Sequence, residues 1–155
     1  MSENAVFQVT PRGDREIVMT RVFDAPRELV WAAFTDPEHL KHWWGRGNPM
    51  TIEIDVRVGG RYRFVEHSPE GDEAFRGEIL ELVPNEKVVQ TFEWEGLPGH
   101  IATDTMVLTE QDGKTLVTTT SMFTSQEDRD GMIASGMETG ARQSYEALEA
   151  YLAKL

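Results

Sequence analysis

The sequence predicts an α+β fold in which a curved antiparallel sheet wraps around one long C-terminal helix. Three observations support this prediction. Two short helix starts follow an early strand, a run of strand patterns comes next, and the chain ends in a long segment with apolar residues at helical spacing. The predicted order is β-αα-β6-α. Such a sheet buries the apolar stripe of an amphipathic helix on its concave face.

The chain of 155 residues is long enough for one domain with a hydrophobic core. We place that domain at residues 15–155, after a loose arm at residues 1–14 that carries few apolar side chains. The first strand is predicted near Glu16–Phe23, because this segment is rich in β-branched residues.

Two short helices are predicted next, and each begins at a proline. The starts are Asp24-Ala25-Pro26 and Asp36-Pro37-Glu38. Proline suits the first helical turn, and a preceding Asp can cap the free backbone donors there. The second helix is predicted to end at Gly45, directly after Trp43-Trp44. We expect one of these two indoles in the core and the other partly exposed.

Six strands are predicted before the C-terminal segment, because apolar and polar residues alternate and turn residues separate the runs. They are Thr51–Val58, Arg61–His67, Glu73–Val83, Lys87–Glu95, Ala102–Thr109 and Thr115–Phe123. In the third run the alternation changes phase around Gly77, which predicts a β-bulge. Consecutive strands of this kind favour an antiparallel meander.

The C-terminal segment is predicted to form one helix from about Ser125 to Lys154. Thr124-Ser125-Gln126-Glu127 is typical of a capping box at its start. Side chains that could face a core then recur at helical spacing: Ile133, Met137, Ala141, Ser144, Tyr145, Leu148, Leu152 and Leu155. This spacing predicts one buried stripe, in which Leu148 and Leu152 are almost fully covered.

The composition excludes several classes of function. The formal net charge of −12 argues against binding to nucleic acid or to an anionic membrane, since both need a basic face. The chain has no cysteine, which excludes disulfides, thiol catalysis and cysteine metal sites. It shows no signal-like N-terminus and no apolar run of about 18 residues, so we expect a cytoplasmic protein without membrane insertion.

Residues that match a known family lie along most of the chain. They are Arg21, Phe23, Ala25-Pro26, Val30-Trp31, Thr35-Asp36-Pro37, Trp43-Trp44-Gly45, Gly59-Gly60-Arg61-Tyr62, Gly77, Val83-Pro84, Gly113-Lys114-Thr115 and Gly136-Met137. Through them the chain resembles the START-like, SRPBCC superfamily, and more narrowly the group named after the C-terminal domain of the HSP90 ATPase activator. The resemblance implies the helix-grip fold, also called Bet v allergen-like, with an internal cavity between sheet and long helix. This superfamily hosts binders, enzymes and co-chaperone domains on one scaffold.

Aromatic and methionine side chains are predicted to line that cavity. The candidate ligand-binding residues are Trp44, Tyr62, Phe64, Phe92, Trp94, Asp104, Met106, Thr120, Met122, Met132, Gly136, Met137 and Gly140. Small-molecule pockets are mostly apolar with a few placed polar groups, and methionine adapts to varied ligands. The alternative is that these side chains form an ordinary tight core.

Three glycines keep the first half of the last helix slim: Gly131, Gly136 and Gly140. A glycine in a helix interior costs about 1 kcal/mol relative to alanine. Close packing, a kink, or room for a ligand would each explain them. If they leave ligand space, Gly136→Ala is expected to be neutral or stabilising. If they permit close packing, the same change is expected to cost about 1–3 kcal/mol.

Asp104 shares a strand face with Met106, which predicts an inward carboxylate. A buried carboxylate is costly unless it is paired, and Arg76 or His67 are the candidate partners. Thr120 is grouped with the inward residues, because it shares a face with Leu116 and Met122 in the last strand pattern. A structural pair, or an Asp104 that is exposed at an edge, is favoured over a catalytic pair.

No motif for a cofactor or a metal is visible. His39 and His42 lie on one short helix beside Glu38, but no third ligand is in reach by sequence, so we expect surface histidines and no metal. The chain has no phosphate-binding glycine loop, dinucleotide fingerprint or nucleophile elbow. We therefore expect no cofactor, and the catalytic residues of any reaction stay unknown.

Three functions fit the sequence. The first is binding of a hydrophobic small molecule, apolar or aromatic and lipid- or polyketide-like, in the cavity. The second is a cavity enzyme of the polyketide cyclase/aromatase or hydrolase kind, using Asp104, Arg76, His67 and Thr120. The third is an HSP90 co-chaperone-like domain. Eukaryotic activators carry a separate N-terminal domain, which residues 1–14 do not supply, so chaperone binding is not expected. A homodimer is compatible with the sequence.

Overall fold

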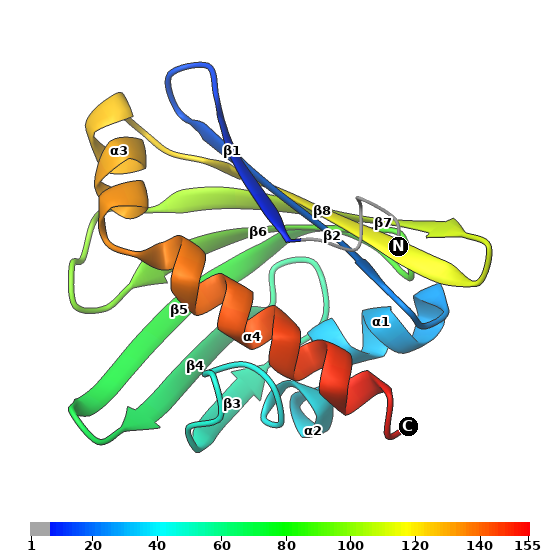
Figure 1. The fold of residues 1–155 in the computed structure, drawn as a ribbon. Coiled ribbons are helices and arrows are strands. Elements are labelled where there is room, and N and C mark those ends of the chain that lie inside the picture. The colour runs from blue at the N-terminus through cyan, green and yellow to red at the C-terminus, as the bar shows by residue number, and fades with distance from the viewer. Residues whose placement is uncertain (1–6) are drawn as a thin grey trace.

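The structure is a computed structural model that describes residues 7–155, and these form a curved antiparallel sheet that wraps around a C-terminal helix (Figure 1). The strands are β1 (Gln8–Arg12), β2 (Glu16–Phe23), β3 (Met50–Ile54), β4 (Arg61–Ser68), β5 (Gly71–Val83), β6 (Lys87–Trp94), β7 (Ala102–Gln111) and β8 (Lys114–Met122). The helices are α1 (Arg27–Thr35), α2 (Pro37–Leu40), α3 (Gln126–Ala134) and α4 (Met137–Leu152). The predicted helix-grip α+β fold is confirmed.

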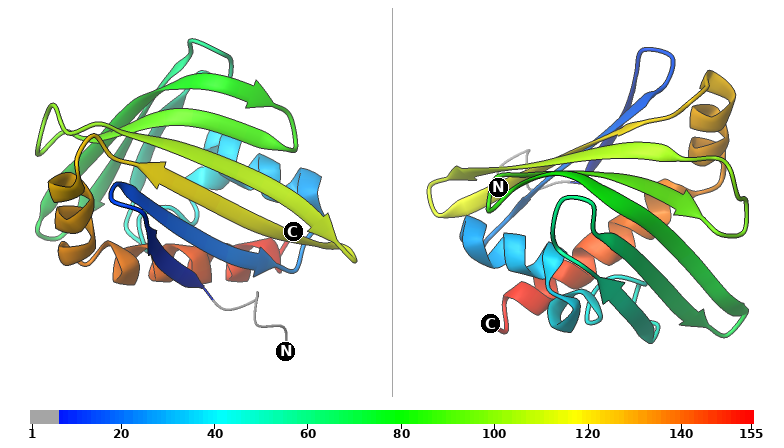
Figure 2. Two further views of the ribbon diagram at one scale, coloured as in Figure 1. Left: turned by 90° about the horizontal axis from the view of Figure 1, so that it is seen from above. Right: turned by 180° about the vertical axis from the view of Figure 1, so that it is seen from behind.

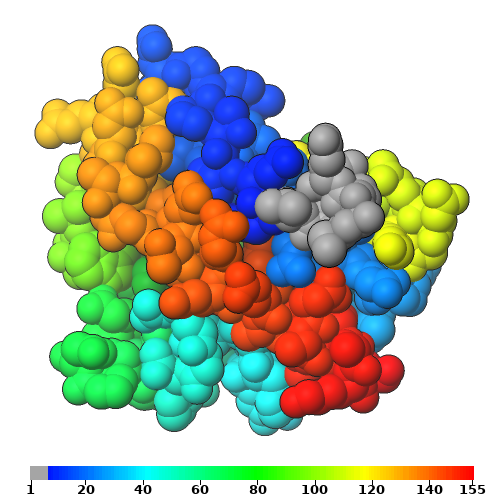
Figure 3. Space-filling view, viewed as in Figure 1, coloured from blue at the N-terminus to red at the C-terminus, as the bar shows by residue number. Residues whose placement is uncertain are grey.

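The sheet order is β1-β2-β8-β7-β6-β5-β4-β3, so strand β2 pairs with the last strand β8. Figure 2 shows α1, α2 and α4 on the concave side of the sheet, while α3 stands at one end near the turn between β1 and β2. In Figure 3 the side chains of α4 meet those of the residues that follow α2. The concave face of the sheet, called the inner face below, is therefore the face that the helices cover.

Tyr145 lies at the centre of the core. Its ring makes edge-to-face contacts with Phe7, Phe23 and Phe34 at centroid distances of 5.3, 5.5 and 6.1 Å, and it lies 6.2 Å from Trp43. Leu148 and Leu152, one and two turns further along α4, are 0% and 4% exposed. The predicted burial of this stripe is confirmed, and it seats the second half of α4 on the sheet.

The tryptophan pair divides as predicted. Trp43 is 1% exposed and its Nε1 donates to the Ala33 carbonyl at 2.9 Å. Trp44 is half-buried against Phe64 and Phe75. Helix α2 is shorter than predicted, because it ends at Leu40 and turns carry the chain to the tryptophans.

The helix starts follow the predicted chemistry in part. The Asp36 carboxylate accepts from the Glu38 backbone N–H at 2.9 Å, as a cap should. Helix α1 has Pro26 at its N-cap and no side-chain cap, so Asp24 does not fill that role. The cap of α3 is Ser125, which accepts from the Asp128 N–H at 3.1 Å, one residue later than the expected capping box.

The N-terminal residues depart from the expected loose arm. Residues 8–12 form β1, which pairs with β2 from Gln8↔Thr20 to Arg12↔Glu16. Residues 1–6 of the predicted arm lie outside the described residues. Strand β1 has mostly exposed side chains, so the hairpin partner rather than apolar patterning holds it in the sheet.

The predicted single C-terminal helix is wrong, since the chain breaks between α3 and α4 at Gly136. This residue has φ of 85°, a left-handed conformation that glycine adopts without steric cost. Helix α3 is held separately by Arg129, which is 6% exposed and whose Nη1 donates to the Gly13 and Glu16 carbonyls, each at 3.1 Å. The break therefore gives α3 and α4 different directions.

Gly77 does not mark a bulge. The register between β5 and β6 shifts between Ile79 and Glu81 instead. At Gly77 a Cβ would collide with the Thr91 carbonyl oxygen and the Tyr62 ring. The missing side chain lets Tyr62 lie across the strand and donate its hydroxyl to that carbonyl, which orients an aromatic ring of the inner face.

Leu148→Ala is expected to lower the free energy of unfolding by about 2–5 kcal/mol, because it removes a fully buried side chain from between helix and sheet. Chemical denaturation measures the change. Glu146→Ala, at an exposed position of the same helix, is the matched control and should stay within about 0.5 kcal/mol of the parent. A loss below about 1 kcal/mol for Leu148→Ala would contradict the packing described.

Replacing Gly136 or Gly140 by alanine is expected to change the free energy of unfolding in opposite directions. Gly136→Ala should destabilise by about 1 kcal/mol, because alanine resists the left-handed backbone. Gly140→Ala should stabilise by up to about 1 kcal/mol, since its Cβ would meet only the Arg46 Cδ, at 3.8 Å.

The expectation that Gly136→Ala measures ligand space is wrong, since the left-handed backbone at Gly136 decides the sign of the stability change. Thermal and chemical denaturation of both variants provide the check. A stabilised Gly136→Ala variant would contradict the break between α3 and α4.

Candidate functional site

Aromatic rings from several elements meet on the inner face of the sheet. Trp44 contacts Phe64 and Phe75 at centroid distances of 5.3 and 5.1 Å. Phe75 stacks on Phe92 at 5.4 Å with an interplanar angle of 22°. Tyr62 lies 4.9 Å from Phe64. Together these side chains form an aromatic wall across β4, β5 and β6.

The inner face is not covered equally along its length. Leu108 and Val117, in the part of the sheet that contacts α1, are 2% and 1% exposed. Other inner-face side chains keep part of their surface accessible, and we call them the inner-face patch: Phe75, Gln90, Phe92, Asp104 and Ser121. Protein atoms therefore cover this patch only partly.

Asp104 places a carboxyl group in the patch. Its neighbours across the two adjoining strands are Gln90 and Ser121. Its Oδ1 is buried and has no hydrogen-bond partner within residues 7–155. Burial raises the pKa of the carboxyl to about 6, and the Ser121 hydroxyl opposes this shift. The predicted inward orientation is confirmed.

The charge of Asp104 acts on both layers of the domain. Burial, and then the carboxylate of Asp104, raise the pKa of the Tyr62 hydroxyl on β4. Burial raises the pKa of Tyr145 on α4 to about 12; a hydrogen bond with Thr119 opposes this rise, and Asp104 adds to it. The carboxyl thus lies close to the sheet and to the helix that crosses it.

The predicted partners of Asp104 are on the wrong face of the sheet. Arg76 extends from the outer face, where its Nε lies 3.0 Å from Glu93 Oε1. His67 is also on the outer face, with Nδ1 3.0 Å from Asp72 and Nε2 2.8 Å from Thr51. The polar set expected for an enzyme is therefore divided between the two sides of the sheet.

Strand β8 faces the opposite way from the prediction. Thr119 and Ser121 share the inner face with Met106 and Asp104, because the register pairs them directly. Thr120 and Met122 consequently lie on the outer face, and Met122 is 38% exposed. The buried side of β8 is rich in hydroxyls, so hydrophobicity alone misassigned the two faces.

The remaining candidate residues are distributed as follows. Met106 is buried on the inner face, and Met137 is half-buried at the start of α4. Met132 packs in a separate cluster with Ile17, Ala102 and Phe123. Gly140 lies beside Arg46 and Gly136 is exposed at the helix break. Trp94 is 39% exposed at the end of β6, and its Nε1 donates to Glu73 at 2.6 Å.

Sequence reasoning missed Phe75 and Ser121. Phe75 is on the strand whose phase change was placed at Gly77, and its pairing with Phe64 settles its face. The position of Phe75 opposite Phe64, another aromatic residue, is the signal from which its face could have been predicted. For Ser121 nothing in the local pattern distinguishes it from the neighbouring threonines.

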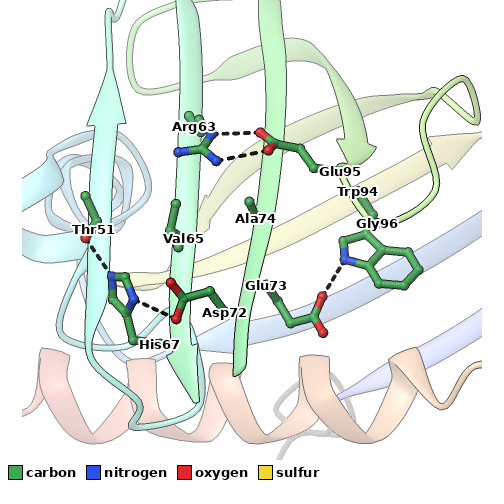
Figure 4. Close-up of a pocket in the computed structure, with 10 residues that line it drawn as sticks. All are labelled: Thr51, Arg63, Val65, His67, Asp72, Glu73, Ala74, Trp94, Glu95 and Gly96. Carbon is green, nitrogen blue, oxygen red and sulfur yellow. Dashed lines mark hydrogen bonds and ion pairs between the residues drawn. The ribbon is translucent and has the colours of Figure 1, made fainter. Parts of the chain in front are cut away.

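The outer face carries two open hollows lined largely by charged side chains. One, of about 510 Å³, is shown in Figure 4. In it Thr51, His67 and Asp72 form a hydrogen-bonded relay across β3, β4 and the start of β5, and Arg63 forms two hydrogen bonds with Glu95. The other hollow, of about 370 Å³, includes the Arg76–Glu93 pair. Exposed pairs of this kind contribute little free energy.

His39 and His42 both contact Tyr151 near the C-terminus. His39 Nδ1 lies 2.6 Å from the Tyr151 hydroxyl, and the His42 ring stacks on the Tyr151 ring. Over residues 7–155 no three His, Cys, Asp or Glu side chains are arranged to hold a metal ion. Within the same range no helix has the length and apolarity needed to cross a membrane.

Comparison with known proteins gives one family. The family described as "Activator of Hsp90 ATPase homolog 1-like protein" matches residues 24–153. No curated protein matches the chain.

Solved structures from several bacteria share the fold. A crystal structure of a Rhodobacter sphaeroides protein has 29% identity and a TM-score of 0.90, and the match covers 97% of this chain and 100% of that one. A solution structure of an Arthrobacter aurescens protein has 25% identity and a TM-score of 0.85, with 96% and 92% covered. A Chromobacterium violaceum protein has 29% identity and a TM-score of 0.76, with 90% and 98% covered.

Asp104 should make the stability of the protein depend on pH. Its pKa is raised to about 6 in the folded state, whereas an unfolded Asp ionises near pH 4. The folded state therefore binds more protons in between, so the free energy of unfolding falls as pH rises from about 4 to about 6 and then levels off.

Asp104→Asn removes the loss of stability that the ionisation of the buried carboxyl causes. A shift of about two pKa units corresponds to roughly 3 kcal/mol, so the variant should gain up to that amount over the parent at about pH 7.5, relative to any difference at about pH 4. Urea denaturation at both pH values measures it. Asp112→Asn, in an exposed turn, should show no such pH-dependent gain. A variant that loses stability at neutral pH would contradict the isolated buried carboxylate.

Proposed function

This chain belongs to the Activator of Hsp90 ATPase homolog 1-like family, and we propose that it binds a hydrophobic small molecule on the inner face of its sheet. The ligand is apolar or aromatic, of a lipid-like or polyketide-like kind, and it lies between the strands and α4. The fold supports this proposal because it sets a curved sheet against a single crossing helix, and sites of this kind are concave and mostly apolar.

The observation that carries the proposal is the partly covered aromatic wall. Phe75 and Phe92 stack on each other and are both only half-buried, although they face the helix side of the sheet. When a ligand covers apolar surface that was accessible to water, the burial of that surface contributes favourably to the free energy of binding. Aromatic ligands gain further from stacked or edge-to-face contacts with such rings.

The break at Gly136 supports the same location. Helix α4 begins after the break, while α3 is tied by Arg129 to the turn between β1 and β2. At Gly140 a Cβ would meet only the Arg46 side chain, at 3.8 Å, so this position of α4 is not tightly packed. Ligand volume under the first half of α4 is therefore compatible with this packing.

Binding is proposed without a reaction. The set Asp104, Arg76, His67 and Thr120 does not assemble, because Asp104 lies on the inner face and the other three on the outer face. The carboxyl of Asp104 is left as the one ionisable side chain of the patch.

The experiment is a binding titration followed by Trp fluorescence and by thermal shift. Probes are fatty acids, aromatic polyketides and small aromatic metabolites. At least one class should raise the melting temperature and change the emission of Trp44, which contacts the aromatic wall. Phe92→Ala should weaken that ligand about tenfold or more, because it removes most of one stacking partner.

Val107→Ala is the matched control. Val107 lies on the outer face of β7 and is 36% exposed, so its truncation should change the affinity less than about twofold. Circular dichroism and the melting temperature establish that both variants are folded. The proposal fails if no class of probe stabilises the protein, or if both variants bind a probe equally well.

A further inference from the structure

We propose that the ligand carries a basic nitrogen and that Asp104 binds it, so the site takes amines attached to an apolar or aromatic body. This inference rests on the proposed function and adds a ligand class to it. Three features of the patch support it: its single carboxyl, the absence of a cation among the described side chains that adjoin this carboxyl, and the aromatic wall on the same face of the sheet.

The carboxyl of Asp104 has an unfilled hydrogen-bonding position. Its Oδ1 is buried, and the described part of the chain supplies it with no partner. A buried carboxylate that lacks a donor is costly, and a charged donor is the partner that best offsets the cost. Among residues 7–155 no side chain donates to Oδ1, so the chain itself leaves this position without a donor.

The groups that face Asp104 come from every neighbouring element. Gln90 on β6 and Ser121 on β8 adjoin it across the strands, and Tyr62 on β4 and Tyr145 on α4 lie within the range of its charge. Tyr62 donates its hydroxyl to the Thr91 carbonyl instead. None of these side chains is a cation.

The basic side chain on the inner face of β2 is Arg21, which is directed to Phe23 and Glu149, although its buried Nε has no hydrogen-bond partner among residues 7–155. Arg21 pairs with Val117, four residues along β8 from the Ser121 that adjoins Asp104. Its guanidinium lies 5.0 Å above the Phe23 ring, and its Nη2 is 3.5 Å from Glu149 Oε1. The carboxylate of Asp104 is thus left for an ammonium group of the ligand.

The surroundings favour a cation attached to an apolar body. Aromatic faces attract ammonium groups, and Tyr62, Phe75 and Phe92 all lie on the inner face with Asp104. The net charge of −12 gives the molecule a negative potential that draws cations toward it. An anionic ligand would meet repulsion from both the carboxylate and the overall charge.

The test compares two probes that share one aromatic body, naphthylethylamine and naphthylethanol. Isothermal titration calorimetry at about pH 7.5 should give the amine at least about tenfold tighter binding than the alcohol. Near pH 5, where Asp104 is mostly protonated, this advantage should shrink, while the affinity for the alcohol should hardly change. Carboxyl NMR should show the pKa of Asp104 falling when the amine saturates the site.

Asp104→Asn should remove the preference for the amine and keep binding of the alcohol, and Asp112→Asn should bind both probes as the parent does. The pH dependence and the carboxyl titration of the parent protein do not depend on the folding of any variant. If the alcohol binds as tightly as the amine, the inference is overturned and the proposed function stands. If neither probe binds at millimolar concentration, the inference is overturned, and the thermal-shift series with fatty acids and polyketides decides the proposed function separately.

Discussion

The packing of Tyr145 against four aromatic rings is the contact on which the arrangement of the domain depends. Phe7, Phe23, Phe34 and Trp43 come from the N-terminal segment, β2, α1 and the turns after α2, and all four rings approach the same side chain of α4. Edge-to-face contacts fix orientation as well as distance. They therefore determine where α4 crosses the sheet, and with it which inner-face residues the helix covers.

The crossing divides the concave side into two regions with different physical character. Around Tyr145 and Leu148, which are 7% and 0% exposed, side chains cover the helix completely or almost so. At its N-terminal end α4 is not continuous with α3, because the left-handed residue Gly136 breaks the helix. Helix α3 is held in a different direction by Arg129, which donates to the carbonyls of Gly13 and Glu16. The aromatic wall meets Trp44, and Phe75 and Phe92 in it stay partly accessible. The packing that buries Tyr145 thus leaves other inner-face rings only partly covered.

Features set by neighbouring residues were predictable, and features set by distant contacts were not. The strand at Glu16–Phe23 and the cap at Asp36 follow from local chemistry, and both were predicted correctly. Strand β1 is polar and depends on its partner, so it looked like a loose arm. The inward face of β8 carries Thr119 and Ser121, and only the register with β7 reveals it. The apolar spacing of an amphipathic helix does not show whether a glycine within it is left-handed. The sequence therefore does not predict the break at Gly136.

The pairing of β2 with β8 has a consequence for the order in which the protein can assemble during synthesis. Residues Glu16 and Met122 are partners, so the hairpin of β1 and β2 leaves the ribosome long before the strand that will hold it. The hairpins from β3 to β7 join neighbours in the sequence and have no such delay. Pairings between distant segments carry a large loop-closure cost and slow folding. The N-terminal hairpin must therefore wait with the edge of β2 unpaired until β8 has been made, and an unpaired strand edge is a site at which other chains can associate.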